Sequence, residues 1–98
     1  MIYLKKILIV TANRAEKGLL DPVMFELKSK NNIEAEWFNV ADLFSTSSKN
    51  MVPEMIRLFD DMLKLFNPDI VMVPCDRWEI AYLAAFAYHQ NKIVVHFH

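Results

Sequence analysis

The 98-residue sequence contains a single glycine, Gly18. Both the G-x-G-x-x-G turn of dinucleotide-binding domains and the P-loop need several glycines, because their backbone must approach a phosphate closely. The scarcity of glycine excludes these two phosphate-binding motifs. If the chain binds a nucleotide, it therefore does so in another way.

Cysteine, net charge and long apolar segments are also scarce. The only cysteine, Cys75, cannot form an internal disulfide, which fits a reducing compartment. The net charge of −1 gives no general attraction to nucleic acid or to an anionic membrane. No apolar run reaches the ~20 residues that span a bilayer, and the first six residues lack the features of a signal peptide. We therefore expect a cytoplasmic protein that binds neither nucleic acid nor a membrane.

Apolar side chains are abundant, and their spacing predicts the secondary structure. They make up 54% of the sequence, more than the ~45–50% of typical soluble domains, and we expect part of the excess at an interface. Continuously apolar or alternating runs predict strands at Lys6–Thr11, Glu34–Val40, Ile70–Val73 and Lys92–Phe97. Helical spacing predicts helices at Leu19–Lys30, from the end of the polar stretch Ser45–Asn50 to about Phe66, and at Trp78–Gln90.

Strands that alternate with helices predict a single α/β domain with a parallel sheet. The two most apolar strands with long connections, Lys6–Thr11 and Ile70–Val73, should be central and adjacent, which gives the strand order 2-1-3-4. Sheets of this kind bind ligands beyond the carboxyl ends of the strands, at the point where the strand order reverses. Two loops rich in charged groups, Thr11–Gly18 and Pro74–Glu79, should flank that point. The sequence ends at His98, in or just after the last strand, which suggests a truncated domain or one that needs a partner.

The first loop carries a residue that suits an anion. Asn13, followed three residues later by Glu16, has the form of a capping box, which is a structural role. Arg14 is not needed for a cap, and an arginine beside the free N–H groups of a helix start suits a phosphate. A solvated arginine without a ligand is the alternative, and position alone weights the two equally.

The second loop offers a candidate carboxylate. Asp76 and Glu79 have the same cap-and-return spacing, and from the sequence alone this structural role is favoured for both. The alternative makes Asp76 a catalytic or sugar-orienting carboxylate at the mouth of the cleft. Cys75 is a weak candidate nucleophile, because the sequence specifies no partner for it.

His96 and His98 lie two residues apart on a predicted strand and therefore face the same way. A His-x-His pair can hold a metal ion, but two ligands without a third are a weak signal. We favour a place for both in the cleft wall and expect no metal. The aromatic residues Trp37, Trp78 and Phe86 are expected in the core and not as stacking platforms.

Several segments form an ordered set of motifs. Val10–Glu16 has the form T-x-x-R-A-[DE], and Gly18–Met24 continues it into a helix. Asn67–Val73 is similar to K-P-D-x-x-x-V, Asp76–Glu79 to G-D-R-[FY]-E, and Lys92–His98 to a strand leading to H-[IV]-[HE]-G-G-E. Together, in order and spacing, they resemble the UDP-N-acetylglucosamine 2-epimerase family. The R-A-E and D-R-W-E variants are more similar to its hydrolysing and bifunctional sialic-acid-pathway members than to its non-hydrolysing members.

The sequence differs from the family pattern in several places. Cys75 stands where the family usually has glycine, and the stretch between the first two helices is short, as if a strand and a helix were missing. The sequence stops before the Gly-Gly-acid segment and lacks the second domain, which binds most of the UDP in the family. The resemblance thus implies the amino-terminal, Rossmann-like three-layer half of a GT-B-type fold, truncated, in residues 1–98.

The chemistry that the resemblance implies is an elimination followed by a hydration. UDP leaves C1 as a proton leaves C2, and water then adds to the 2-acetamidoglucal to give N-acetylmannosamine. A carboxylate of adjusted pKa and cations at the departing diphosphate serve such a reaction. By the same resemblance, Arg14 faces the diphosphate and Asp76 acts at the sugar as an acid/base or as its orienter. The cleft wall is then formed by Arg77, Glu79, His96 and His98.

The resemblance also implies the partners and the limits of the chain. The ligand is UDP-N-acetylglucosamine, no cofactor is implied, and a second domain or subunit completes the enzyme, with a homodimer as one option. The first alternative is a non-catalytic nucleotide-sugar-binding or interaction module descended from such a half. The second is an unrelated flavodoxin-like domain, which predicts that Arg14 and Asp76 do not converge on one cleft.

Overall fold

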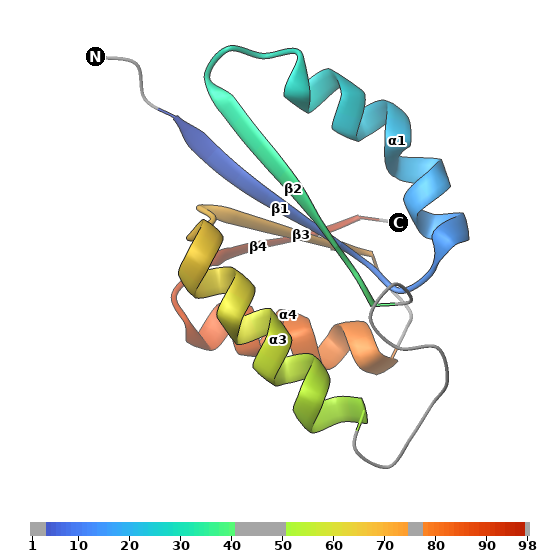
Figure 1. Ribbon diagram of the computed structural model, residues 1–98, viewed down its shortest axis with the longest axis vertical. Helices are drawn as coiled ribbons and strands as arrows, with labels where there is room; N and C mark the ends of the chain where they lie inside the picture. Colours follow the sequence, from blue (N-terminus) through green and yellow to red (C-terminus); the bar gives the residue numbers. More distant parts are fainter. Residues whose placement is uncertain (1–3, 41–50, 75–77, 98) are drawn as a thin grey trace.

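The computed structural model of the chain describes residues 4–40, 51–74 and 78–97. Its centre is a four-stranded parallel sheet in the order β2 (Ile33–Asn39), β1 (Lys5–Thr11), β3 (Ile70–Pro74) and β4 (Ile93–Phe97) (Figure 1). The predicted strand order 2-1-3-4 and the parallel direction are confirmed. The observed strand bounds differ from the predicted ones by one residue at most.

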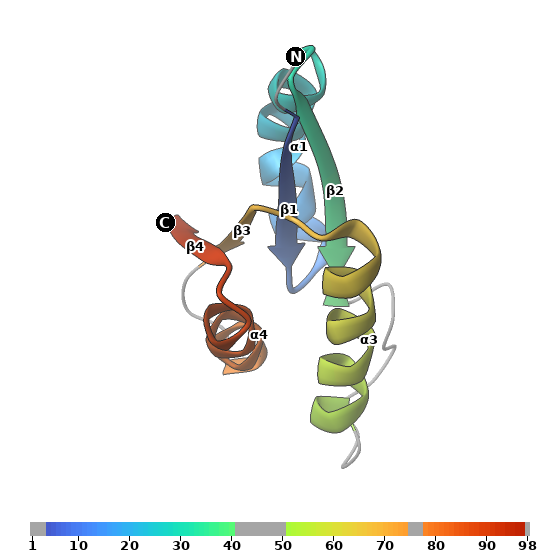
Figure 2. The same ribbon diagram turned by 90° about the vertical axis from the view of Figure 1, so that its left-hand side faces the viewer.

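Helices cover both faces of the sheet. Helix α1 (Arg14–Lys28) lies against β1 and β2 on one face, and α3 (Met51–Phe66) and α4 (Trp78–His89) lie on the other (Figures 1 and 2). The chain therefore has the predicted Rossmann-like arrangement of three layers. None of the described helices is both long enough and apolar enough to cross a membrane.

The central strand β1 is buried on both faces because its apolar residues are continuous. Ile7 and Ile9 pack against Met24 of α1, whereas Leu8 and Val10 belong to the cluster formed with α3 and α4. A strand in the middle of a parallel sheet needs apolar side chains on both faces, since helices cover each face. This double burial fixes β1 between its two neighbours.

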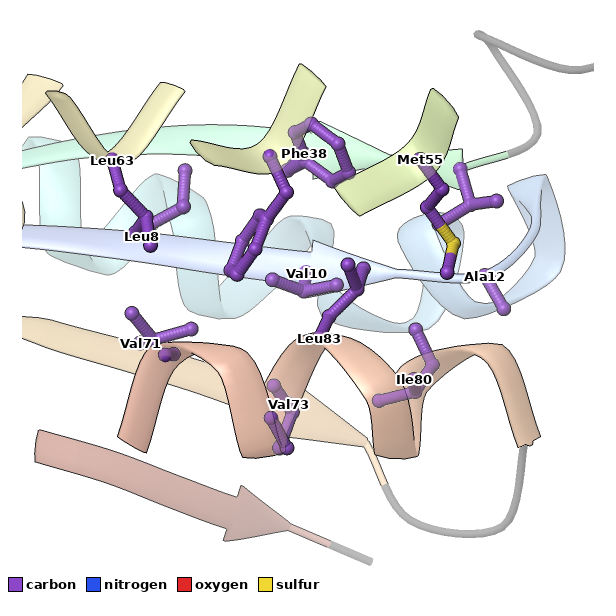
Figure 3. Close-up of a cluster of buried hydrophobic side chains, with 14 of the residues drawn as sticks. Leu8, Val10, Ala12, Phe38, Met55, Leu63, Val71, Val73, Ile80 and Leu83 are labelled. Carbon is purple, nitrogen blue, oxygen red and sulfur yellow. The ribbon is translucent and has the colours of Figure 1, made fainter. Parts of the chain in front are cut away.

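The larger core cluster lies between the sheet and the helices α3 and α4. Figure 3 shows Leu8 and Val10 of β1 between side chains of α3 and side chains of α4. At its centre the fully buried ring of Phe59 meets Phe38 edge-on, with 5.1 Å between ring centroids, and Phe86 at 6.2 Å. The apolar residues of α3 recur at helical spacing and form one stripe against the cluster, whose members are Met55, Leu58, Phe59, Met62, Leu63 and Phe66.

Helix α1 corrects two expectations. It begins at Arg14 and not at Leu19, because Asn13 caps it, and it ends at Lys28 with Ser29 as its C-cap. Most of the predicted loop Thr11–Gly18 is therefore strand or helix. Val23 is 37% exposed although it is apolar, whereas the neighbouring Met24 is buried.

The other apolar helix, α4, buries only one face in this chain. Ile80, Leu83 and Ala87 are buried against the core, whereas Tyr82 and Tyr88 on the opposite side are 50% and 72% exposed. The nearly uniform apolar character of α4 therefore reflects one packed face and one face rich in tyrosine and alanine.

We expect Phe59→Ala to lower the free energy of unfolding by about 3–5 kcal/mol, because it removes a fully buried ring and leaves a cavity. Urea denaturation followed by circular dichroism measures this change. Leu65→Ala is the matched control, since Leu65 lies on the same helix but is 86% exposed, and its effect should stay within about 0.5 kcal/mol. Equal effects of the two substitutions would contradict the described core.

Candidate functional site

The point where the strand order reverses lies between β1 and β3. These strands are hydrogen-bonded neighbours in parallel register, with Ile7 opposite Ile70 and Ile9 opposite Met72. The chain leaves β1 towards α1 on one face of the sheet, and the next helix after β3 is α4 on the other face. The carboxyl ends of these two strands therefore define the place where a crevice opens in sheets of this type. We call the end of the sheet formed by Asn39, Thr11, Pro74 and Phe97 the carboxyl edge.

Two buried polar side chains lie at the carboxyl edge of β1 and β2. The hydroxyl Oγ1 of Thr11, which is fully buried, donates to Oδ1 of Asn39 at 3.1 Å. Asn39 is only 5% exposed, and its Nδ2 has no hydrogen-bond partner among the described residues. A buried donor without an acceptor costs about 1–3 kcal/mol. An acceptor brought by a bound molecule would recover that energy.

The sequence reasoning did not single out Asn39. An asparagine near the end of a strand is ordinarily attributed to the following turn. The signal that could have found it is its register: Asn39 stands directly opposite Thr11, so the two polar residues at neighbouring strand ends could meet.

The start of α1 confirms the capping box at Asn13 and Glu16, with one difference. Oδ1 of Asn13 accepts a hydrogen bond from the backbone N–H of Glu16 at 2.9 Å. The carboxylate of Glu16 reaches one residue further back than in the usual motif and accepts from the N–H of Ala12 at 2.6 Å. The structural interpretation of these two residues is therefore correct.

The cap leaves part of the helix start unsatisfied. In the described part of the chain, the backbone N–H of Ala15 has no acceptor. Free N–H groups and the helix dipole give the start of a helix a partial positive charge, which attracts anions. The first turn of α1 directly follows the carboxyl end of β1, so this charge lies at the carboxyl edge.

Lys17 connects the first turns of α1 to the neighbouring strand. Its Nζ lies 5.4 Å from the centroid of the Trp37 ring, within the range of a cation–π contact. Trp37 is half-buried and packs against the cluster beneath α1, and Phe86 packs against the opposite cluster. The packing roles expected for these two aromatic residues are confirmed. The sequence reasoning did not identify Lys17.

The structure places only some of the predicted site residues. Arg14 is the first residue of α1 and Glu79 the second of α4, but their side chains are outside the described groups. His96 is an exposed residue of β4 and stands opposite Val73. The remaining predicted residues, together with the side chain of Trp78, lie outside the described residues: Cys75, Asp76, Arg77 and His98.

The structure therefore brings together the backbone segments next to the predicted residues Arg14 and Asp76 and does not describe the side chains of these two residues. The turn before Arg14 follows β1, and Cys75 is bonded to Pro74 at the end of β3, so both connections leave the sheet at the carboxyl edge. The described residues contain no group of three or more histidine, cysteine, aspartate or glutamate residues that could hold a metal.

A pocket of about 360 Å³ lies away from this crevice, between β2 and α3. Its walls are mostly apolar, and Asn39 is the member of the carboxyl edge that borders it. The lining residues are Trp37, Phe38, Asn39, Leu58, Asp61, Met62 and Leu65. The pocket is therefore a separate feature from the point between β1 and β3.

Comparison with known proteins identifies the fold. The sequence matches no protein-family profile, and no curated protein is similar to it. Solved structures are similar. The UDP-GlcNAc 2-epimerase from Neisseria meningitidis, bound to UDP-GlcNAc, shares 23% identity and superposes with a TM-score of 0.76 over 94% of this chain and 31% of its own. The chain has the fold of one part of that enzyme.

Other similar structures give the same result. The enzyme of the same name from Methanocaldococcus jannaschii shares 19% identity and superposes with a TM-score of 0.75, over 93% of this chain and 30% of its own. The S. aureus MnaA–UDP structure shares 19% identity with a TM-score of 0.76, over 95% of this chain and 29% of its own. The chain thus spans less than a third of these proteins and forms a Rossmann-like half-domain of the GT-B type.

We expect Asn13→Ala to destabilise the protein by about 1 kcal/mol, because the N–H of Glu16 loses its acceptor. Asn13→Asp is the matched control, since a carboxylate oxygen also accepts this bond, and it should retain nearly all of the stability. Chemical denaturation gives the stabilities, and amide hydrogen exchange at Glu16 reports the cap directly. The described cap is wrong if the alanine and aspartate variants behave alike.

Proposed function

We propose that the chain is the amino-terminal, Rossmann-like part of a UDP-N-acetylglucosamine 2-epimerase and that turnover requires a second domain or subunit. The observation that carries this proposal is the position of the motif T-x-x-R-A-E. It occupies the end of β1 and the start of α1, at the carboxyl edge beside β3, in a chain with the fold of part of several UDP-GlcNAc 2-epimerases.

The carboxyl edge supplies groups that suit a diphosphate. The N–H of Ala15 is free of acceptors among the described residues, and the start of α1 is partially positive. Arg14, one residue before Ala15, would add a full positive charge and could bind phosphate oxygens through two N–H groups. Charge that develops on the departing UDP would be stabilised there.

The proposed reaction has two steps. A base removes the proton from C2 of the sugar while the C1–O bond to UDP breaks, which leaves a C1–C2 double bond. Water then adds across this double bond, with its hydroxyl to C1 and a proton to C2. The proton arrives on the face of C2 opposite to the one from which the first proton left, and N-acetylmannosamine results. Asp76 would act at the sugar as acid/base or as its orienter. The cleft wall would be completed by Arg77, Glu79, His96 and His98.

We assign the chain to the hydrolysing type on its motif variants, Arg14-Ala15-Glu16 and Asp76-Arg77-Trp78-Glu79. The product distinguishes the types, because a hydrolysing enzyme releases free N-acetylmannosamine and UDP. A non-hydrolysing enzyme keeps the sugar attached to UDP.

A non-catalytic nucleotide-sugar-binding module is the second candidate. The similarity to the solved structures, at 19–23% identity, supports a shared fold, and a shared fold does not by itself imply turnover. Such a module would bind the ligand at the same edge of the sheet. It would convert none of the ligand even when a second domain is supplied.

We expect UDP-N-acetylglucosamine to shift the amide resonances of Ala15 and Glu16 in NMR titrations, because both lie at the start of α1. Arg14→Gln should weaken binding about ten-fold or more, since a charged hydrogen bond to the diphosphate is lost. Arg57→Gln is the control, because Arg57 is an exposed residue of α3 that pairs with Glu54 at 2.8 Å and Asp61 at 3.5 Å. The proposed site would be contradicted if Arg14→Gln left the affinity unchanged, or if the amide resonances shifted only in other regions of the chain.

Turnover provides a separate test. The purified chain should convert no UDP-N-acetylglucosamine. A fusion in which it replaces the matching 31% of the Neisseria meningitidis enzyme should release product, and Asp76→Asn in that fusion should abolish the release. Chromatography of the products separates free N-acetylmannosamine from the UDP-linked sugar. A folded fusion that binds UDP-N-acetylglucosamine without converting it would favour the binding module instead.

A further inference from the structure

The pocket between β2 and α3 has the size of a small-molecule site and no part in the proposed reaction. Its volume of about 360 Å³ lies within the ~300–1,000 Å³ of clefts that hold small ligands. Among its lining residues, Phe38 is buried in the core cluster, and Leu58 and Met62 pack against that cluster. Because the same core packing holds both walls in place, the pocket is part of the folded domain.

The walls of this pocket leave large apolar side chains in contact with water. Leu65 lines the pocket and is 86% exposed, and Trp37, Leu58 and Met62 are only partly buried. A molecule with an apolar body would cover these side chains, and the removal of apolar surface from water favours binding. The side chains therefore select an occupant that is largely apolar.

The charge on the wall formed by α3 is negative. Asp61 is the one lining residue with a formal charge, and its side chain is 54% exposed. It shares Arg57, at 3.5 Å, with Glu54, which approaches the same guanidinium more closely at 2.8 Å. The nearby Lys64 pairs with Asp60 at 2.9 Å. Since one cation serves two carboxylates and the other has its own partner, Asp61 favours a ligand that brings a positive charge.

The free edge of β2 adds backbone groups to the pocket. The N–H of Lys5 donates to the carbonyl of Asn32 at 2.9 Å, so Asn32 points its carbonyl towards β1. Successive residues of a strand point their backbone groups in opposite directions within the sheet. Trp37 and Asn39 lie an odd number of residues further along and therefore direct their N–H and C=O groups away from β1. Both residues line the pocket, and the described chain supplies no backbone partner for these groups.

We propose that this pocket binds a small organic cation, an apolar molecule that carries one ammonium group. Its apolar body lies against Leu58, Met62 and Leu65, and the ammonium donates to the carboxylate of Asp61. An ammonium has three N–H donors, and the outward carbonyls of β2 are acceptors for the others. The exposed carboxylate of Glu36 on the same strand adds to the attraction.

The charge of the pocket distinguishes its ligand from the nucleotide sugar. A diphosphate would meet the like charge of Asp61 here, whereas the start of α1 at the carboxyl edge is partially positive. The two sites therefore take ligands of opposite charge. This proposal is independent of the proposed function.

Three probes with one shared apolar body test the class of ligand: phenylbutylamine, phenylbutanol and phenylbutyrate. NMR titrations of the purified chain, followed at the methyl groups of Met62 and Leu65, measure their affinities. We expect the amine to bind about five-fold more tightly than the alcohol, since a partly exposed ion pair contributes up to about that factor, and the butyrate to bind most weakly. Equal affinities for the amine and the alcohol, or no shifts at these methyl groups, would overturn the proposal.

Two substitutions on α3 test the place of the ammonium. Asp61→Asn should remove the preference for the amine and leave the affinity for phenylbutanol unchanged, whereas a purely structural role of Asp61 would weaken both probes alike. Leu65→Lys places a cation four residues after Asp61, where it can pair with that carboxylate along the helix. It should abolish the preference for the amine as well.

Leu19→Lys is the matched control for Leu65→Lys. Leu19 is 80% exposed on α1 and does not line the pocket, and the two substitutions change the net charge equally. Both positions are exposed, so both variants should fold, which circular dichroism checks. We expect Leu19→Lys to keep the wild-type preference for the amine. Equal losses in the two lysine variants, or an unchanged preference in folded Leu65→Lys, would show that the amine does not bind at Asp61.

Discussion

The burial of β1 on both faces is the constraint on which the rest of the structure depends. Ile7 and Ile9 pack under α1, while Leu8 and Val10 pack under α3 and α4, so β1 is stable only in the middle of the sheet. Its parallel pairing with β3 then brings the ends of both strands to the same edge. The start of α1 and the last residue of β3, Pro74, lie at the same edge of the sheet for this reason.

The carboxyl edge contains hydrogen-bond donors that have no acceptor in the described part of the chain. The cap at Asn13 and Glu16 satisfies only part of the start of α1, and the Thr11–Asn39 pair leaves one buried amide N–H without an acceptor. Buried donors without an acceptor, such as the amide of Asn39, are uncommon in native proteins and call for an explanation such as a bound ligand or water. Free N–H groups at an exposed helix start are ordinary, and they are available to an anion. A phosphate and a sugar hydroxyl are acceptors that could satisfy such donors, which is consistent with the proposed nucleotide-sugar ligand.

The sequence was sufficient for the strand order because hydropathy distinguishes a strand buried on both faces from an edge strand. Lys5–Thr11 is continuously apolar after its first residues, whereas Ile33–Asn39 alternates and carries Glu34 and Glu36. Apolar periodicity places the start of α1 at Leu19, whereas the helix begins at Arg14. The first turn of this helix is polar, and the capping box at Asn13 was the better start signal. Asn39 was missed because its burial depends on Thr11, 28 residues away in the chain.

The most direct test of the account uses the only cysteine, Cys75, which follows the last residue of β3. A nitroxide spin label at Cys75 broadens the NMR signals of nearby amides. Adjacent connections at one edge predict strong broadening at Asn13 and Glu16, and little at Lys5 and Asn32, which lie at the other end of the sheet. Broadening at Lys5 and Asn32, with Asn13 and Glu16 unaffected, would contradict a shared carboxyl edge and with it the sugar-nucleotide site.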